Sequence, residues 1–174
     1  NLNDTAETLI LVKLAQAYDG NDPDLAMDYV QQSLSLSEQI GYKKGIGNAY
    51  NMMAIINATQ GDYITSLNLY NKALLIRKEI GDKRGTAGSL INIGSIYSNL
   101  GNYPEALKNY FTGLKITEQI GEQQFMENAL NNIGFVYMKQ ENYPEALKIF
   151  FANKKIQEKK GDKYGLGYTY RNIS

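Results

Sequence analysis

The sequence contains neither cysteine nor histidine. Without cysteine, no disulfide or thiolate chemistry constrains the compartment. Without histidine, the chain lacks a usual metal ligand and the commonest general base. No apolar run approaches the ~18 residues of a membrane span, and no signal-peptide pattern is found at the N-terminus. We therefore expect no metal, no other cofactor and no membrane insertion.

The sequence has no net positive charge that would attract a polyanion, because 18 basic side chains balance 18 acidic ones. This balance argues against a general nucleic-acid binder. The charge is nevertheless uneven: residues 1–42 carry seven acids and one base, whereas residues 139–174 carry eight bases and four acids. Such an asymmetry could steer partners or favour head-to-tail contacts, and ordinary solvated helix faces are the simpler interpretation.

Most of the chain repeats with a period of 40 residues, marked by Gly41, Gly81, Gly121 and Gly161. No gap is needed between residues 47 and 166. Such a period predicts a single array in which each unit buries its apolar face against its neighbours. The expected units are 7–46, 47–86, 87–126 and 127–166, with a partial unit at 167–174. Because the chain starts without methionine and stops inside a repeat, we interpret it as a fragment of a longer polypeptide.

Each unit has the pattern of a helical hairpin. In the third unit an apolar stripe with helical spacing comprises Leu90, Ile93, Gly94 and Tyr97. Pro104 fits the first turn of a second helix, where its missing N–H has no intrahelical partner anyway. Gly121 is placed to end that helix in the left-handed conformation. Asp82 and Asp162 are placed to cap the helices that follow them.

This pattern predicts two sets of helices and no strand. The first helices of the units are expected at about 3–18, 43–59, 83–99, 123–139 and 163–174. The second helices are expected at about 23–40, 63–80, 103–120 and 143–160. Because the connections are short, consecutive helices must be antiparallel neighbours. The predicted fold class is all-α, an α-solenoid of antiparallel hairpins wound into a right-handed superhelix.

The order of small and large positions in each unit resembles the tetratricopeptide repeat. That family places large residues at positions 4 and 7, a small residue at 8, aromatics at 11 and 24, and small residues at 20 and 27. The third unit supplies Leu90, Ile93, Gly94, Tyr97, Ala106, Tyr110 and Gly113; the fourth supplies Leu130, Ile133, Gly134, Tyr137, Ala146 and Phe150. The second supplies Tyr50, Met53, Ala54, Ser66, Tyr70 and Ala73.

The longer period resembles the variety found in kinesin light chains, Pins-type polarity scaffolds and bacterial Rap-type regulators. The phrases NNIG, GNYPEALK and IGDKRG resemble repeats of large bacterial signalling proteins. Asn57 departs from the family pattern at an aromatic position, and Phe125 replaces a glycine of the other units. Asn153, Lys154 and Lys160 replace apolar residues, which predicts a looser surface there or a contact with a polar group.

The side of the first helices that faces away from the hairpin core is rich in asparagine. In tetratricopeptide arrays this side lines the concave groove. The predicted peptide-binding residues are Asn48, Asn51, Met52, Ile55, Asn92, Asn128, Asn131, Asn132, Phe135, Lys139, Arg171 and Asn172, with Ile91 and Tyr168 beside them. An amide carries both a donor and an acceptor, so such a ladder could pair with an extended peptide backbone. The alternative is a row of solvated or mutually bonded amides.

The leading hypothesis is a non-catalytic scaffold that holds a protein or an extended peptide segment on the concave face of the first helices. The alternative is a sensory or regulatory region of a bacterial multidomain signalling protein, such as a histidine kinase, cyclase or transcription regulator. This alternative acts through dimerisation or intramolecular contacts, and a homodimer is compatible with both hypotheses. We expect no enzyme activity and favour a cytoplasmic location, or a periplasmic one if the full-length chain is a membrane-bound sensor.

Overall fold

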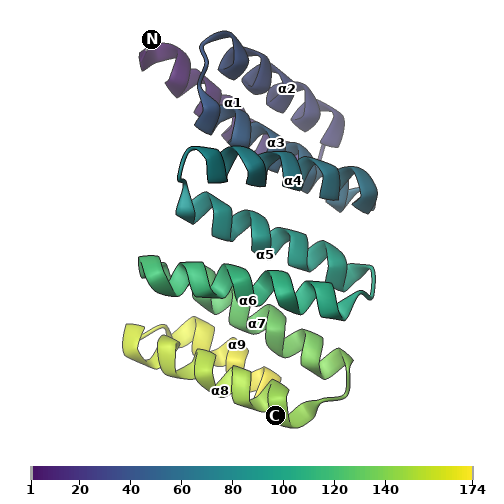
Figure 1. Cartoon of the computed structure of the whole chain (residues 1–174), viewed down its shortest axis with the longest axis vertical. Coiled ribbons are helices and arrows are strands. Elements are labelled where there is room, and N and C mark those ends of the chain that lie inside the picture. Colours follow the sequence, from purple (N-terminus) through teal and green to yellow (C-terminus); the bar gives the residue numbers. More distant parts are fainter. Residues whose placement is uncertain (1, 174) are drawn as a thin grey trace. The chain divides into compact units, whose positions relative to one another are not determined.

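The computed structural model describes the backbone of residues 2–173, and the side chains there except those of Leu2, Lys163, Tyr164, Tyr168, Tyr170 and Ile173. Over this range the chain forms nine α-helices and no strand (Figure 1). They are α1 (Leu2–Tyr18), α2 (Pro23–Gln39), α3 (Lys43–Thr59), α4 (Tyr63–Glu79), α5 (Lys83–Asn99), α6 (Tyr103–Ile120), α7 (Gln123–Lys139), α8 (Tyr143–Lys160) and α9 (Lys163–Ile173). The all-α prediction is confirmed.

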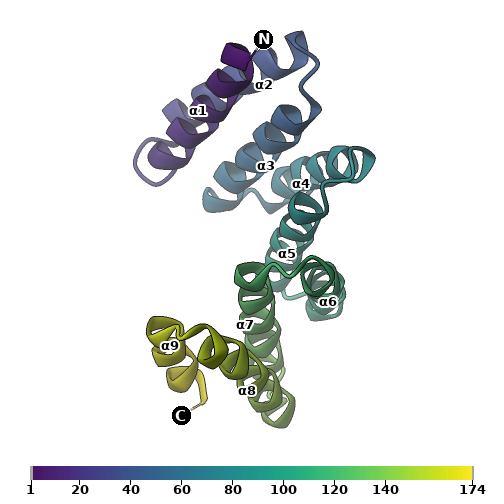
Figure 2. The same cartoon turned by 90° about the vertical axis from the view of Figure 1, so that its left-hand side faces the viewer.

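The chain divides into two compact units, which we call the N-terminal half (Asn1–Ser89) and the C-terminal half (Leu90–Ser174). In the N-terminal half each helix from α1 to α4 packs against the next, and α1 also contacts α3 (Figure 2). In the C-terminal half α6, α7, α8 and α9 pack consecutively in the same way. Each half therefore has the hairpin packing of an α-solenoid. The single array over the whole chain stays a prediction.

The helices begin and end where the turn residues predict. Gly121 has φ 70° and ψ 23°, the left-handed conformation that glycine adopts without a Cβ penalty. The carboxylate of Asp82 accepts a hydrogen bond from the backbone N–H of Gly85 at 2.9 Å. Asp162 caps α9 in the same way through Gly165, also at 2.9 Å. Both predicted caps are confirmed.

The core of each hairpin depends on small residues where the two helices approach. A Cβ atom added to Gly94 would lie 2.8 Å from the ring of Tyr110, and one added to Gly134 would lie 2.5 Å from the ring of Phe150. The aromatic ring of the second helix therefore occupies the space that a side chain of the first helix would need. This contact confirms the predicted register of both hairpins and fixes which side of α5 and α7 faces away from the core.

Candidate functional site

A pocket of about 360 Å³ lies between the first helices α5 and α7 of the C-terminal half. It is lined by Ile91, Asn92, Ser95, Asn128, Asn131, Asn132 and Phe135. Five of the predicted peptide-binding residues thus come together in one cavity, along with Ile91. Ser95 is a lining residue that the sequence pattern missed. The peptide-binding role of these residues stays a prediction.

The walls of the pocket are held by contacts with the hairpin core. The hydroxyl of Ser95 donates to the carbonyl of Ile91 at 3.1 Å and accepts from the hydroxyl of Tyr110 at 3.1 Å. Burial raises the pKa of Tyr110, so this phenol keeps the proton that it donates. The ring of Phe135 meets that of Phe150 edge to face, with centroids 5.8 Å apart. These contacts pre-order the pocket before any ligand arrives.

Asn92 and Asn132 are the least engaged asparagines of the pocket. Both are half-buried, and neither side chain makes a hydrogen bond with any residue that the structure describes. They occupy the same place in successive repeats, on α5 and α7. Each therefore offers one amide donor and one amide acceptor to a ligand.

Asn131 and Asn128 are instead held by neighbours within the chain. The side-chain oxygen of Asn131 accepts a hydrogen bond from Nδ2 of Asn153 at 2.9 Å. The side-chain oxygen of Asn128 accepts from Nε2 of Gln124 at 3.5 Å, on the exposed side of α7. Both residues line the pocket with their oxygens already engaged.

In the N-terminal half the predicted residues Asn48 and Asn51 are bound by Arg77 of α4. Its guanidinium donates to the side-chain oxygens of Asn51 at 3.0 Å and Asn48 at 3.3 Å. It also donates to the carbonyl of Gly85 at 3.1 Å and the hydroxyl of Ser89 at 2.6 Å. Burial lowers the pKa of Arg77, and the charge of Asp82 opposes that effect.

Sequence reasoning missed Arg77, although a signal for it was present. One place on the second helices carries a polar residue in all four repeats, and in each the side chain is buried: Ser37, Arg77, Thr117 and Gln157. A polar residue recurring on the buried side of a helix usually finds hydrogen-bond partners there, although the Ser37 hydroxyl has none among the described residues. For Gln157 the partner is Thr169, whose hydroxyl donates to it at 2.8 Å.

Met52 was wrongly assigned to the groove. It is 3% exposed and belongs to the core cluster with Ala49 and Ile56. The reason is that α1 contacts α3, so the neighbouring first helix covers the side of α3 that was expected to face a ligand. Ile55 is half-buried against the same cluster.

Three other expected residues are not among the described residues that line the pocket. Lys139 and Arg171 are exposed, near the ends of α7 and α9. The side-chain nitrogen of Asn172 is buried without a hydrogen-bond partner among the described residues, unlike the open amides of Asn92 and Asn132. The side chain of Tyr168 lies outside the described residues.

Two of the three unusual polar residues of α8, Asn153 and Lys160, contact α7. Asn153 is 0% exposed, and Lys160 forms an ion pair with the buried carboxylate of Glu127 at 3.4 Å. Lys154 pairs with Glu158 on the same helix at 3.4 Å. Of the two outcomes expected here, a polar contact is therefore the one observed.

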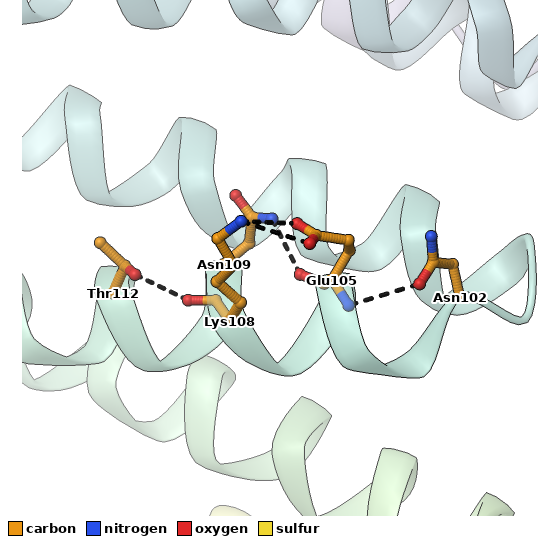
Figure 3. Close-up of polar contacts among 5 residues, drawn as sticks. All are labelled: Asn102, Glu105, Lys108, Asn109 and Thr112. Atoms are coloured by element: carbon orange, nitrogen blue, oxygen red, sulfur yellow. Dashed lines mark hydrogen bonds and ion pairs between the residues drawn. The ribbon is translucent and has the colours of Figure 1, made fainter.

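The polar surface of α6 shows how differently an ordinary helix face is arranged (Figure 3). Asn102 caps the N–H of Glu105 at 3.4 Å, and Lys108 forms an ion pair with the carboxylate of Glu105 at 3.1 Å. The amide of Asn109 donates to the carbonyl of Glu105 at 2.8 Å, and Thr112 donates to that of Lys108 at 2.7 Å. All of these contacts remain within the helix and its cap, so they offer a ligand few open groups.

Within the described residues, no group of acidic side chains could hold a metal ion. No described helix is long and apolar enough to cross a membrane. Neither finding bears on the pocket between α5 and α7, whose lining carries amides, one hydroxyl and two apolar side chains.

The nine helices of residues 2–173, packed as consecutive hairpins, define a helical repeat protein, and comparison with known families identifies the repeat. Two profiles described as tetratricopeptide repeat match residues 45–119 and 128–150. The chain belongs to the tetratricopeptide repeat family. No curated protein sequence matches it significantly.

Several solved structures share the fold. Aspartyl phosphate phosphatase F from Bacillus subtilis is 15% identical with a TM-score of 0.88, over 95% of this chain and 44% of that one. The apo form of RapI is 25% identical with a TM-score of 0.80, over 91% and 58%. A Rap protein complexed with competence and sporulation factor is 20% identical with a TM-score of 0.87, over 95% and 46%. The chain thus spans about half the length of these structures.

Proposed function

We propose that the chain is a non-catalytic binding module that holds an extended protein or peptide segment in the pocket between α5 and α7. The observation that carries this proposal is the pair of unengaged amides, Asn92 and Asn132, placed one repeat apart in the same cavity. A peptide backbone presents alternating N–H and C=O groups, which an asparagine side chain can pair with on both its atoms.

The lining also indicates what kind of segment fits. No charged side chain lines the pocket, while Ile91 and Phe135 contribute apolar surface. Small-molecule pockets are typically apolar, whereas five of the seven lining residues here are polar, which suits the polar backbone of a peptide. An internal, uncharged stretch of a partner chain suits this surface better than a terminal carboxylate, which would need a cation.

A catalytic role has little support. The pocket holds no acid, base or activated nucleophile: Ser95, its one hydroxyl residue, already donates to Ile91 and accepts from Tyr110. A serine hydroxyl is a weak nucleophile unless a general base, a lowered pKa or a metal activates it, and no charged side chain lines the pocket. We therefore assign the pocket to binding, with a protein or peptide rather than nucleic acid as its partner.

A sensory or regulatory region of a signalling protein is the second candidate. It is favoured by RapI, which reaches 25% identity over 91% of this chain. The same fold also occurs as the tetratricopeptide repeat sensor of a signal transduction ATPase from Pyrococcus horikoshii, at 19% identity and a TM-score of 0.78. Such a region acts through dimerisation or contacts within its own protein, and the pocket is compatible with either.

The test is to pan phage-displayed random linear peptides on the whole chain and to titrate an enriched peptide into ¹⁵N-labelled protein. We expect the side-chain amide signals of Asn92 and Asn132 to shift, together with backbone signals of α5 and α7. Failure to enrich any peptide, or shifts confined to the lysines of α8, would place the function elsewhere.

A further inference from the structure

In each half, a buried side chain of a second helix donates a hydrogen bond to the side-chain oxygen of an asparagine on a first helix. In the N-terminal half Arg77 of α4 donates to the side-chain oxygen of Asn51 on α3. In the C-terminal half Asn153 of α8 donates to the side-chain oxygen of Asn131 on α7. Asn51 and Asn131 occupy the same place two repeats apart. Two different donors thus produce the same orientation of the amide.

The orientation of Asn153 is favoured by a neighbour that can only accept, although its own Oδ1 is buried without a hydrogen-bond partner among the described residues. Its Nδ2 lies 3.5 Å from the backbone carbonyl of Glu127 as well as 2.9 Å from the oxygen of Asn131. Turning the amide over would bring its oxygen against that carbonyl, and two acceptors repel. Asn131 must therefore present its oxygen to Asn153 and its nitrogen elsewhere.

The nitrogen of Asn131 is left available. It makes no hydrogen bond with any described residue, and it is not one of the buried polar atoms that lack a partner. Asn131 lines the pocket, so this nitrogen is its remaining polar atom for a ligand. Asn51 must likewise turn its side-chain oxygen toward Arg77 and leave its nitrogen available, because a guanidinium has only donors and cannot pair with the amide nitrogen.

We propose that Asn153 is a positioning residue that holds the amide nitrogen of Asn131 toward the pocket, where it donates a hydrogen bond to a backbone carbonyl of the bound peptide. The inference rests on the proposed function and adds the direction of one of its hydrogen bonds. Asn131 acts as a donor of fixed direction, whereas Asn92 and Asn132 are free to turn and serve as donor or acceptor.

Hydrogen exchange of the side-chain amides in the free protein tests the orientation without any ligand. The amide protons of Asn131 should exchange with solvent as fast as those of Asn92, while those of Asn153 should be protected. Asn153→Ala should leave the fold intact, because the equivalent residue of the second unit is the fully buried Ala73. Protected amide protons on Asn131 in the unchanged chain would overturn the inference.

Binding of a display-selected linear peptide tests the consequence. Asn131→Asp keeps an acceptor for Asn153 and replaces the donor by a carboxylate oxygen, so the affinity should fall by about tenfold or more. Asn153→Ala leaves the amide of Asn131 free to turn, so the affinity should fall less, by about two- to fivefold. Asn142→Asp is the matched control, since it adds the same charge at the N-cap of α8, and it should leave the affinity unchanged.

The two proposals fail in different ways. Unchanged affinity in Asn131→Asp, with Asn142→Asp also unchanged, overturns the donor role of Asn131 even if the peptide binds in the pocket. If no displayed peptide binds, the proposed function fails, and the exchange rates of Asn131 and Asn153 still decide the orientation.

Discussion

Arg77 carries a positive charge into the interior of the N-terminal half, where its side chain is 8% exposed. No carboxylate of a described residue forms an ion pair with it, and its Nε has no hydrogen-bond partner. The charge is compensated by four neutral oxygens and, at longer range, by Asp82. Burial of a charge is tolerated only with such hydrogen bonding, so Arg77 ties α3, α4 and the start of α5 together.

Arg77→Met retains most of the stem volume and removes the donors. We expect it to lower the free energy of unfolding by about 1–3 kcal/mol, because the groups around it lose bonds to a charged partner. Lys83→Met, which removes the same charge from an exposed position on α5, should change it by less than about 0.5 kcal/mol. Urea denaturation followed by circular dichroism measures both, and equal midpoints would show that the Arg77 bonds contribute nothing.

At the scale of the element, the hairpins depend on close approach at Gly94 and Gly134. Gly134→Leu places its Cβ within 2.5 Å of the Phe150 ring, so α7 and α8 must separate. We expect a loss of about 1–3 kcal/mol or more from overpacking. Gly167→Leu is the control in the same half, since a Cβ there meets nothing within 4 Å. Thermal unfolding should separate the two variants, and similar melting temperatures would contradict the packing described.

The ion pair between α7 and α8 replaces a pair of apolar residues of the preceding repeat. Glu127 and Lys160 stand where Ala87 and Ile120 stand. Lys160→Ile alone leaves a buried carboxylate without its partner and should lower the free energy of unfolding by about 1–3 kcal/mol. Adding Glu127→Ala should recover most of that loss, since apolar residues can often replace a buried ion pair and the same apolar pair occupies these places in the preceding repeat.

Denaturant midpoints of the two single variants and the double variant form the required cycle. We expect the midpoint of the double variant to lie close to that of the original chain. Additive losses would mean that the two side chains act independently and that their contact has no energetic role.

The helices were predictable because each depends on local signals. The hydrogen-bond partners of the buried polar side chains were not predictable. Period, Pro104 and the capping residues Asp82 and Asp162 placed each described helix boundary within one residue of the observed one, while the end predicted at residue 174 lies outside the described residues. Arg77 and Asn153 find partners on other helices, up to 29 residues away in sequence. Such pairings depend on which side chains meet after packing, and a single sequence does not contain that geometry.

The pocket was predicted only in part, because its lining also depends on which helices pack together. The angle of each residue around a first helix placed Asn92, Asn132 and Phe135 on one side, and all three line the pocket. It could not show that α1 covers Met52, because that burial comes from a contact between two first helices.

At the scale of the whole molecule, the stability of a fragment should depend on how many of its neighbouring helices each helix still contacts. A fragment ending at residue 86 loses Ser89, which accepts a 2.6 Å hydrogen bond from Arg77, and most of α5. A fragment ending at residue 99 keeps both. We expect the longer fragment to be more helical and to unfold at a higher urea concentration. Indistinguishable fragments would show that α5 adds nothing to the N-terminal half.

The central claim is that Asn92 and Asn132 bind a peptide segment from the face opposite the hairpin core. Asn172 is left out of the test because its side-chain nitrogen is buried. The double variant Asn92→Ala with Asn132→Ala should keep its fold and gain slightly in stability, because alanine is the better helix former. Asn109→Ala on α6 is the matched control, since that amide bonds to its own helix outside the pocket.

The most direct measurement is calorimetry of a display-selected peptide with the unchanged chain, the double variant and the control. Losing two neutral hydrogen bonds should weaken binding by about 1–3 kcal/mol, or roughly five- to 150-fold, while Asn109→Ala leaves it unchanged. An unchanged affinity in the double variant, with binding abolished by Lys154→Ala, would contradict the claim and move the binding surface to α8.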